Sequence, residues 1–139
     1  MGKTSAFSDM IEQALLNTHT AFIGRVVSME GNFASVQPLN MTQSMDGEVS
    51  KLPKLDRVPV LKSVRKWDKK EEIISTSAGD PAHTHKIEHW EPRKPEPGDV
   101  VYCVCADRDI SETQKGEFAV PVLGKHMLSS AVVVGIFEV

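Results

Sequence analysis

The sequence predicts an all-β domain that is preceded by one helix and interrupted by a long β-hairpin. Three observations lead to this prediction: five apolar runs of strand length, a polar turn that joins the first two runs, and a charged stretch at residues 63–97. A chain of 139 residues suffices for one domain with its own core. We therefore expect an N-terminal helix within residues 1–18 and a β domain at 19–139, from which residues 63–97 protrude.

Residues 5–17 have the periodicity of an amphipathic helix. Their apolar side chains recur at intervals of three and four residues and would form one face, made of Phe7, Met10, Ile11, Ala14 and Leu15. Such a helix would pack on the β domain that follows it, or on its symmetry mates in an oligomer.

The predicted strands begin with the clearest hairpin of the sequence, in which residues 30–32 form a tight turn rich in residues suited to positive φ. The third strand is short, and Pro59 within it indicates an edge position or a bulge. The fourth strand is continuously apolar, which is typical of a strand buried on both sides. The five predicted strands are residues 20–29, 33–39, 58–61, 100–106 and 131–137.

Five strands with an early hairpin and a long connection between the third and the fourth are typical of a small Greek-key barrel of the OB type. The connection is too long for a structureless loop inside a compact domain. Trp67 and Trp90 flank it and would face each other across two arms, because aromatic cross-strand pairs stabilise ribbons. The predicted arms are residues 71–77 and 82–90, with a turn at residues 79–81.

Histidines are concentrated on the second arm. Three of the five histidines fall within residues 83–89, and His83 and His85 are two positions apart. On an extended strand both imidazoles leave the same face, which would give a transition metal its first two ligands. The remaining ligands would come from elsewhere in the chain or from other copies of it. The alternative is that both histidines are solvated surface residues.

The other histidines are weaker candidates for a metal site. His89 shares a strand face with His85 but lies toward the base of the arm. His19 and His126 lie at element boundaries, where a structural role is expected.

Composition narrows the function classes. The formal net charge of -3 argues against a broad basic surface and so against non-specific nucleic-acid binding. No apolar run approaches the ~20 residues that span a bilayer, and no apolar signal core follows the first residues, so cytoplasmic synthesis is expected. We expect Cys103 and Cys105 to be small buried hydrophobes in a reduced protein, with a Cys-Val-Cys zinc half-site as the alternative.

Several segments of the chain form a recognisable combination: TAFIGRVV at residues 20–27, ASVQPL at 34–39, PGDVV at 97–101 leading to ADRDIS at 106–111, and KHMLSSA at 125–131. Together they resemble the OB-fold N-terminal domain of the cell-puncturing central spike of contractile phage tails. The last segment stands where that family has a basic-His-x-Leu-Ser-Asp-Ala segment, with Ser130 in the place of the frequent Asp. The resemblance covers most of the chain apart from residues 63–97.

This resemblance implies a homotrimer on the tail axis, attached to the hub proteins of the baseplate and facing the host cell envelope. The location would be the tail baseplate of a virion or of a phage-tail-like particle. Relatives carry a β-helical needle after this domain, and its apex often holds His-x-His from three chains around an iron ion. Here the sequence stops at Val139, just after the last predicted strand, so we expect residues 63–97 to replace the needle.

In that arrangement three copies of His83 and His85 would complete an octahedral shell of six imidazoles around one metal ion. An all-nitrogen octahedral shell disfavours zinc, and with the resemblance we expect Fe(II). A site without an open position would be mechanical rather than catalytic.

No catalytic constellation is recognisable, so we do not expect an enzyme. The alternative function is an OB-fold module that binds nucleic acid or another ligand. However, Phe22 and Phe33 lie in apolar contexts that indicate core, and the basic residues cluster in the insertion, so no nucleic-acid partner is expected. A metallohydrolase that uses His83, His85 and His89 would need a carboxylate such as Glu88, which points to the opposite strand face from His85.

Overall fold

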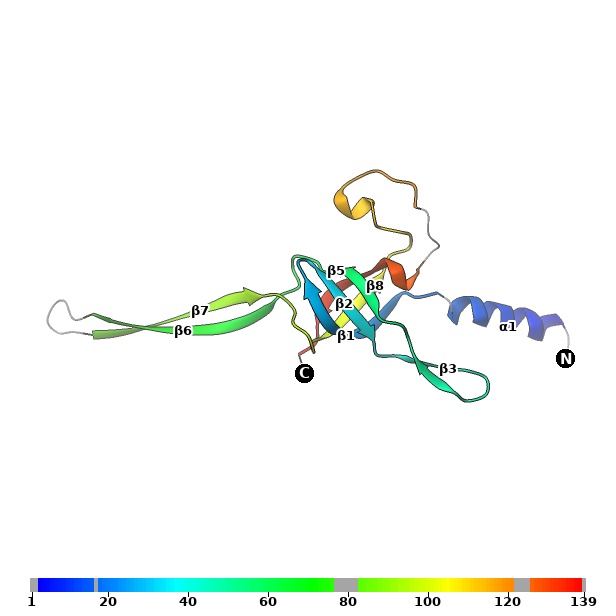
Figure 1. Cartoon of the computed structure of the whole chain (residues 1–139), viewed down its shortest axis with the longest axis horizontal. Coiled ribbons are helices and arrows are strands. Elements are labelled where there is room, and N and C mark those ends of the chain that lie inside the picture. Colours follow the sequence, from blue (N-terminus) through cyan, green and yellow to red (C-terminus); the bar gives the residue numbers. More distant parts are fainter. Residues whose placement is uncertain (1–2, 17, 77–82, 122–125, 139) are drawn as a thin grey trace.

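The computed structural model describes residues 3–16, 18–76, 83–121 and 126–138. In this part of the chain the protein is mostly β, with one α-helix and a curled antiparallel sheet at its centre. A long hairpin extends from one side of the sheet and the N-terminal helix from the other (Figure 1). The prediction of a β-rich fold with an N-terminal helix is therefore confirmed.

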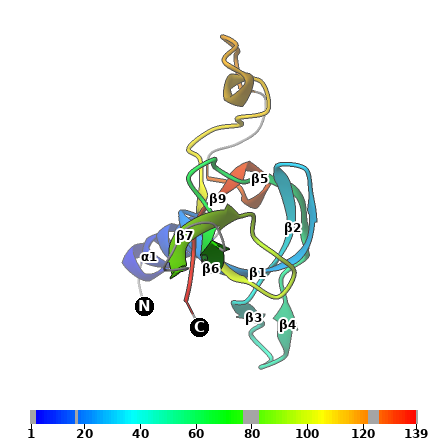
Figure 2. The same cartoon turned by 90° about the vertical axis from the view of Figure 1, so that its left-hand side faces the viewer.

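The central sheet has five strands in the order β5-β2-β1-β8-β9, and all neighbouring strands are antiparallel. A parallel bridge between Val60 and Val133 then joins the two ends of the sheet. Figure 2 shows the resulting curl, with the hairpin pointing toward the viewer. The strand bounds are β1 (Ala21–Glu30), β2 (Phe33–Pro38), β5 (Leu55–Pro59), β8 (Val100–Cys105) and β9 (Ala131–Ile136).

The core lies on the concave face of this sheet, because side chains alternate between the two faces of each strand. Small and β-branched residues dominate it, which suits a tightly curled sheet. Its members are Phe22, Val26, Ala34, Val36, Val58, Val64, Val101, Cys103, Cys105, Ala131 and Val133.

The prediction that the fourth strand is buried on both sides is wrong. In β8, Val101, Cys103 and Cys105 are buried, whereas Tyr102 and Val104 are 40% and 38% exposed. The strand is apolar throughout because its outer face is apolar too, and nothing in the described chain covers that face. This outer surface continues onto β1, where Ile23 pairs with Tyr102 and is 38% exposed.

Two other strand predictions differ in detail. The third strand of the sheet, β5, begins at Leu55 rather than at residue 58, because Leu55 pairs with Val36 across a bulge. The polar stretch after β2 contains a small second hairpin, β3 (Met41–Gln43) and β4 (Val49–Lys51), which polar composition concealed. Its turn includes Gly47 at φ +89°.

Helix α1 (Lys3–Leu16) stands apart from the sheet in Figure 1. Its apolar residues Phe7, Met10 and Leu15 are 66%, 69% and 65% exposed. The helix therefore does not bury its apolar face against the described part of its own chain. A second projecting segment, between β8 and β9, contains the short 3-10 helix η1 (Thr113–Lys115), and a further one, η2 (Leu128–Ser130), precedes β9.

The long hairpin consists of β6 (Lys66–Thr76) and β7 (His83–Arg93), which pair with each other in continuous register from Lys66↔Arg93 to Thr76↔His83. The arms are thus longer than predicted toward the base of the hairpin. The turn predicted at residues 79–81 lies outside the described residues. In chain order the hairpin follows β5 and precedes β8.

Candidate metal-binding hairpin

The base of the hairpin is fixed to the sheet through Asp99. One oxygen of its carboxylate lies 3.0 Å from the Lys66 Nζ at the start of β6, and the other accepts a 2.7 Å hydrogen bond from the Glu96 N–H. The Val26 N–H in β1 donates to the Asp99 backbone carbonyl at 2.9 Å. Gly98 makes the required turn at φ +95°. These contacts hold the direction in which the hairpin leaves the sheet.

A second group of ion pairs strengthens the same end of the ribbon. The Arg93 guanidinium lies 3.1 Å from Asp68 and 2.6 Å from Glu96. Val64, in the segment that leads into β6, is 4% exposed and belongs to the core. The sequence signal for this anchor was the Pro-Gly-Asp turn, but its pairing with Lys66 depends on the fold and was not predicted.

Residues that pair across the ribbon share a face, so the register divides the hairpin into two surfaces. The histidine face includes the positions of His83, His85, Ile87, His89 and Glu91, with their partners on β6. The tryptophan face includes Trp67, Lys69, Glu71, Ile73, Lys86, Glu88 and Trp90.

His83 and His85 lie on one face of β7, as predicted, in register with Thr76 and Ile74 respectively. They occupy the end of the hairpin that is far from the sheet (Figure 1). His85 is exposed. The side chain of His83 lies outside the described part of the structure.

The remaining histidines differ in their surroundings. His89 is on the histidine face, and its Nε2 lies 3.0 Å from a Glu91 carboxylate oxygen. His19 and His126 are far from the hairpin in sequence and meet each other through a 2.9 Å backbone hydrogen bond from the His19 N–H to the His126 carbonyl. His126 adopts φ +48° at this junction.

The described residues of one copy do not by themselves form a closed metal site on this hairpin. Among the described residues no group of three histidine, cysteine or acidic side chains is close enough to hold a metal ion. The register places positions 83 and 85 on one strand face, which is what a metal site shared between several copies would require of each chain. Glu88 pairs with Glu71 on the tryptophan face, so it lies on the strand face opposite to that of His85, as the alternation of side chains along a strand predicts. A metallohydrolase site would need this carboxylate on the same face as the histidines.

The predicted tryptophan pair has a different geometry. Trp67 is directly opposite Pro92, and Trp90 is directly opposite Lys69. The two indoles are therefore diagonal neighbours on the same face, where they are 59% and 61% exposed. The two rings were predicted to face each other across the arms, but they are offset by two positions of the register. Distance from an unknown turn does not fix the register.

Both cysteines are free and buried in the core strand β8, as expected from their apolar context. Burial, with a smaller contribution from the neighbouring Cys105, raises the pKa of the Cys103 thiol to about 12. Burial also raises the pKa of Cys105. Neutral thiols that face the core agree with the small-hydrophobe interpretation rather than with a zinc half-site.

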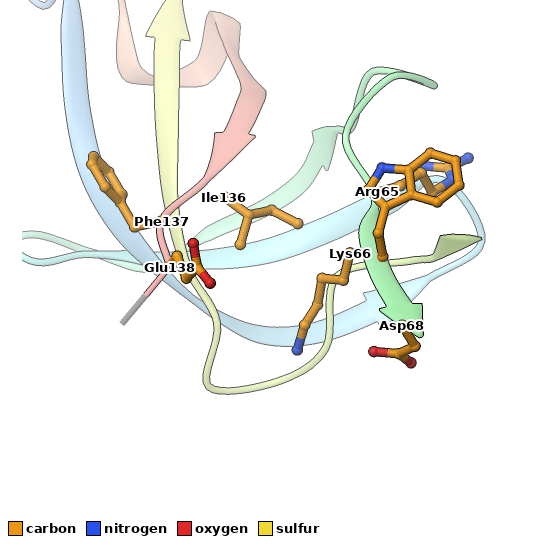
Figure 3. A pocket seen from close by; sticks show the side chains of 7 residues that line it. Arg65, Lys66, Asp68, Ile136, Phe137 and Glu138 are labelled. Carbon is orange, nitrogen blue, oxygen red and sulfur yellow. The ribbon is translucent and has the colours of Figure 1, made fainter. Parts of the chain in front are cut away.

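A hollow of about 360 Å³ lies where the hairpin base meets the end of the chain (Figure 3). Lys66 and Asp68 come from β6, whereas Ile136, Phe137 and Glu138 come from the end of β9 and the residues after it. Its described lining mixes charged and apolar groups and includes no histidine or cysteine. The hollow is thus a junction between β6 and the residues at the end of β9.

Comparison with known proteins gives no assignment: no protein-family model matches the chain, and no curated protein matches it. Within the described residues, no helix has the length and apolar character needed to cross a membrane.

Proposed function

We propose that this protein is a structural component of a contractile phage tail or of a related injection machine. In this proposal it is the trimeric central spike of the baseplate. The sheet docks on the hub proteins, and the hairpin faces the target envelope. Its role is mechanical, not enzymatic.

The observation that carries the proposal is the exposed hairpin. Each strand has 11 residues, and none of the hairpin side chains that the structure describes is buried. An isolated two-stranded ribbon is at best marginally stable in water. A hairpin of this length is therefore expected to be supported by other copies, and a threefold axis along the hairpin provides that support.

The central sheet supports the finer assignment to an OB-type barrel. It has five strands, antiparallel neighbours, and one parallel bridge between its ends. These are features of a small, partly open Greek-key barrel, which is the domain expected from the resemblance. The exposed apolar residues Ile23, Tyr102 and Val104 on its outer face provide surface for contacts with hub proteins or with other copies.

The tip of the proposed trimer is held by a metal ion. His83 and His85 of three copies supply six imidazoles, and Fe(II) is the ion that we favour. A metal cross-link at this point stabilises strand ends that otherwise fray, and keeps the tip rigid under load.

The proposal is tested by mass and metal content of untagged protein. We expect three times 15.3 kDa in solution and about one iron per three chains. Replacement of His83 and His85 together by Asn removes the iron, whereas His89→Asn retains it, because His89 is nearer the base of the hairpin. A monomer at micromolar concentration contradicts the spike assignment, and a trimer without metal contradicts only the tip site.

One observation bears on the alternative, an OB-fold nucleic-acid or ligand-binding module. The Arg57 guanidinium lies 4.5 Å from the centroid of Phe33, on the β2–β5 side where such barrels bind single strands. Phe33 is thus half-buried beneath an arginine rather than in the core. The neighbouring acidic residues Glu30 and Asp56 disfavour a phosphate backbone there. Salt-sensitive binding of a fluorescent oligonucleotide below micromolar concentration would favour this alternative.

A further inference from the structure

The tryptophan face of the hairpin has its charges neutralised within one chain. Lys69 lies 3.1 Å from Glu88 and 3.9 Å from Glu71. Lys86 lies 3.3 Å from Glu71 and 3.5 Å from Glu88. Two lysines and two glutamates therefore form a closed quartet in the middle of this face, with no net charge.

Large apolar side chains lie on both sides of the quartet. Trp67 and Trp90 are toward the base of the hairpin, and Ile73 is toward its far end, in register with Lys86. Ile73 is 69% exposed, and the two indoles are about as exposed as it is. The described part of the same chain leaves most of their surface open, although Trp67 also lines the hollow at the hairpin base. Both tryptophans of the chain belong to this one surface.

We propose that the hairpins of neighbouring copies contact one another through the tryptophan face. The inference rests on the proposed function, and it specifies that this face points toward the threefold axis near the hairpin base. A second copy is the occupant that the charges favour. A face with no net charge does not repel an identical face, and the alternating lysines and glutamates can pair across the contact as well as within it.

The size of this surface agrees with a shared contact between copies. Tryptophan side chains bury ~150–250 Å² each, so the two indoles contribute a substantial part of the ~800 Å² that each partner gives to a standard interface. The rest would come from the exposed outer sheet face and from helix α1. Aromatic anchors at the centre of an interface carry a large share of its binding energy.

An inward tryptophan face near the base is compatible with inward histidines at the tip. The two strands of the hairpin cross in Figure 1, so the ribbon is twisted along its length. The face directed at the axis therefore changes between base and tip. The quartet lies between the two regions, where the change would occur.

The experiment uses the intact chain and its own fluorescence. Because the chain has two tryptophans and both lie on this face, the emission spectrum reports the contact directly. We measure emission and acrylamide quenching across a dilution series while sedimentation velocity records the mass. Association should shift the emission to the blue and protect both indoles from acrylamide.

A double variant, Trp67→Ala with Trp90→Ala, should raise the concentration at which half of the protein assembles by at least roughly 30-fold. Phe118→Ala is the matched control, since Phe118 is fully exposed on the segment between β8 and β9 and lies outside the hairpin. Circular dichroism checks that both variants keep the sheet.

The outcomes separate this inference from the proposed function. A trimer whose tryptophans remain open to acrylamide, or whose assembly is unchanged in the double variant, overturns the assignment of the face and leaves the spike proposal standing. A wild-type chain that stays monomeric at all concentrations overturns both.

Discussion

The central sheet and the long hairpin are built from the same antiparallel pairing, but they differ in what stabilises them. In the sheet, every strand buries at least one side chain, and Val36, Val101 and Val133 are completely inaccessible. In the hairpin, none of the described side chains is buried. The sheet gains its stability from apolar burial, whereas the hairpin relies on backbone hydrogen bonds, exposed ion pairs and its anchored base.

This difference indicates that the sheet and the hairpin have different roles. The sheet is equipped to fold as a single chain, because it has its own core. The hairpin is held at one end and presents apolar and ionic side chains over the part that the structure describes. We therefore expect its order to depend on contacts with other chains, and we propose that copies associate through it. The predictions below test this contrast, beginning with the largest effect.

Thiol chemistry should distinguish the two regions most strongly. The pKa of Cys103, about 12 instead of 9.0, lowers the thiolate fraction at pH 8 by on the order of 1,000-fold. Iodoacetamide should therefore not label the native chain at pH 8 and should label it readily in urea. A Glu72→Cys variant on the hairpin should be labelled at once under native conditions. Rapid labelling of Cys103 in the folded wild type would contradict the proposed core.

The same thiol makes stability depend on alkaline pH. In the unfolded chain it ionises near its ordinary pKa of 9.0, whereas in the folded chain it keeps its proton until about pH 12. The unfolded state then binds fewer protons, so the free energy of unfolding should fall as pH rises from 9 toward 12. Urea titrations at pH 8 and pH 10 check the sign, and Cys103→Ala should reduce the difference between them.

Truncation of a core side chain should lower the free energy of unfolding more than truncation of a hairpin side chain. Val133→Ala should lower the free energy of unfolding by about 2 kcal/mol, because it leaves a cavity that the completely buried surroundings cannot fill. Ile87→Ala, on the histidine face of the hairpin, should change it by less than ~0.5 kcal/mol. Urea unfolding followed by circular dichroism gives both values. An equal loss of unfolding free energy at the two positions would contradict the claim that only the sheet is stabilised by apolar burial.

Two glycines within the sheet provide a finer test of packing. A Cβ at Gly24 would collide with the buried side chain of Val36, so Gly24→Ala should cost about 1–3 kcal/mol. A Cβ at Gly135 would meet no atom within 4 Å, so Gly135→Ala should be close to neutral. The urea midpoints of the two variants give the comparison, and a neutral Gly24→Ala would show that β1 and β2 are less closely packed than described.

The smallest effect is expected at the anchor between sheet and hairpin. Asp99→Asn removes the charge partner of Lys66 but retains an oxygen for the Glu96 N–H, so the loss of stability should be about 1 kcal/mol. Asp56→Asn is the control, at an exposed ion pair with Lys54 on the sheet edge, and it should leave the free energy of unfolding almost unchanged. Amide hydrogen exchange should increase at the base of β6 and β7 in Asp99→Asn alone. Equal exchange in both variants would contradict the anchoring role.

The sequence was most informative where apolar periodicity and turn chemistry agreed. The first hairpin, the strand with the two cysteines and the last strand could be located because a core face needs apolar residues at every second position. The strand face shared by His83 and His85 followed from the same period. These inferences need only local geometry.

Other features could not be predicted because they depend on pairs distant in sequence. The apolar outer face of β8 has the same composition as a strand buried on both sides. The tryptophans could not be placed without the register, and the pairing of Lys66 with Asp99 depends on the route of the chain between them. β3 and β4 are short and fully exposed, so no hydrophobic pattern marks them.

The most direct test of the central claim, that copies join through the hairpin, is sedimentation of a chain that lacks it. Lys66 and Arg93 are paired opposite each other, so residues 67–92 can be replaced by an Asn-Gly turn without moving the ends. We predict a trimer for the wild type, and for the shortened chain a folded monomer with the β-sheet spectrum retained. A shortened chain that is folded and still trimeric would contradict the account.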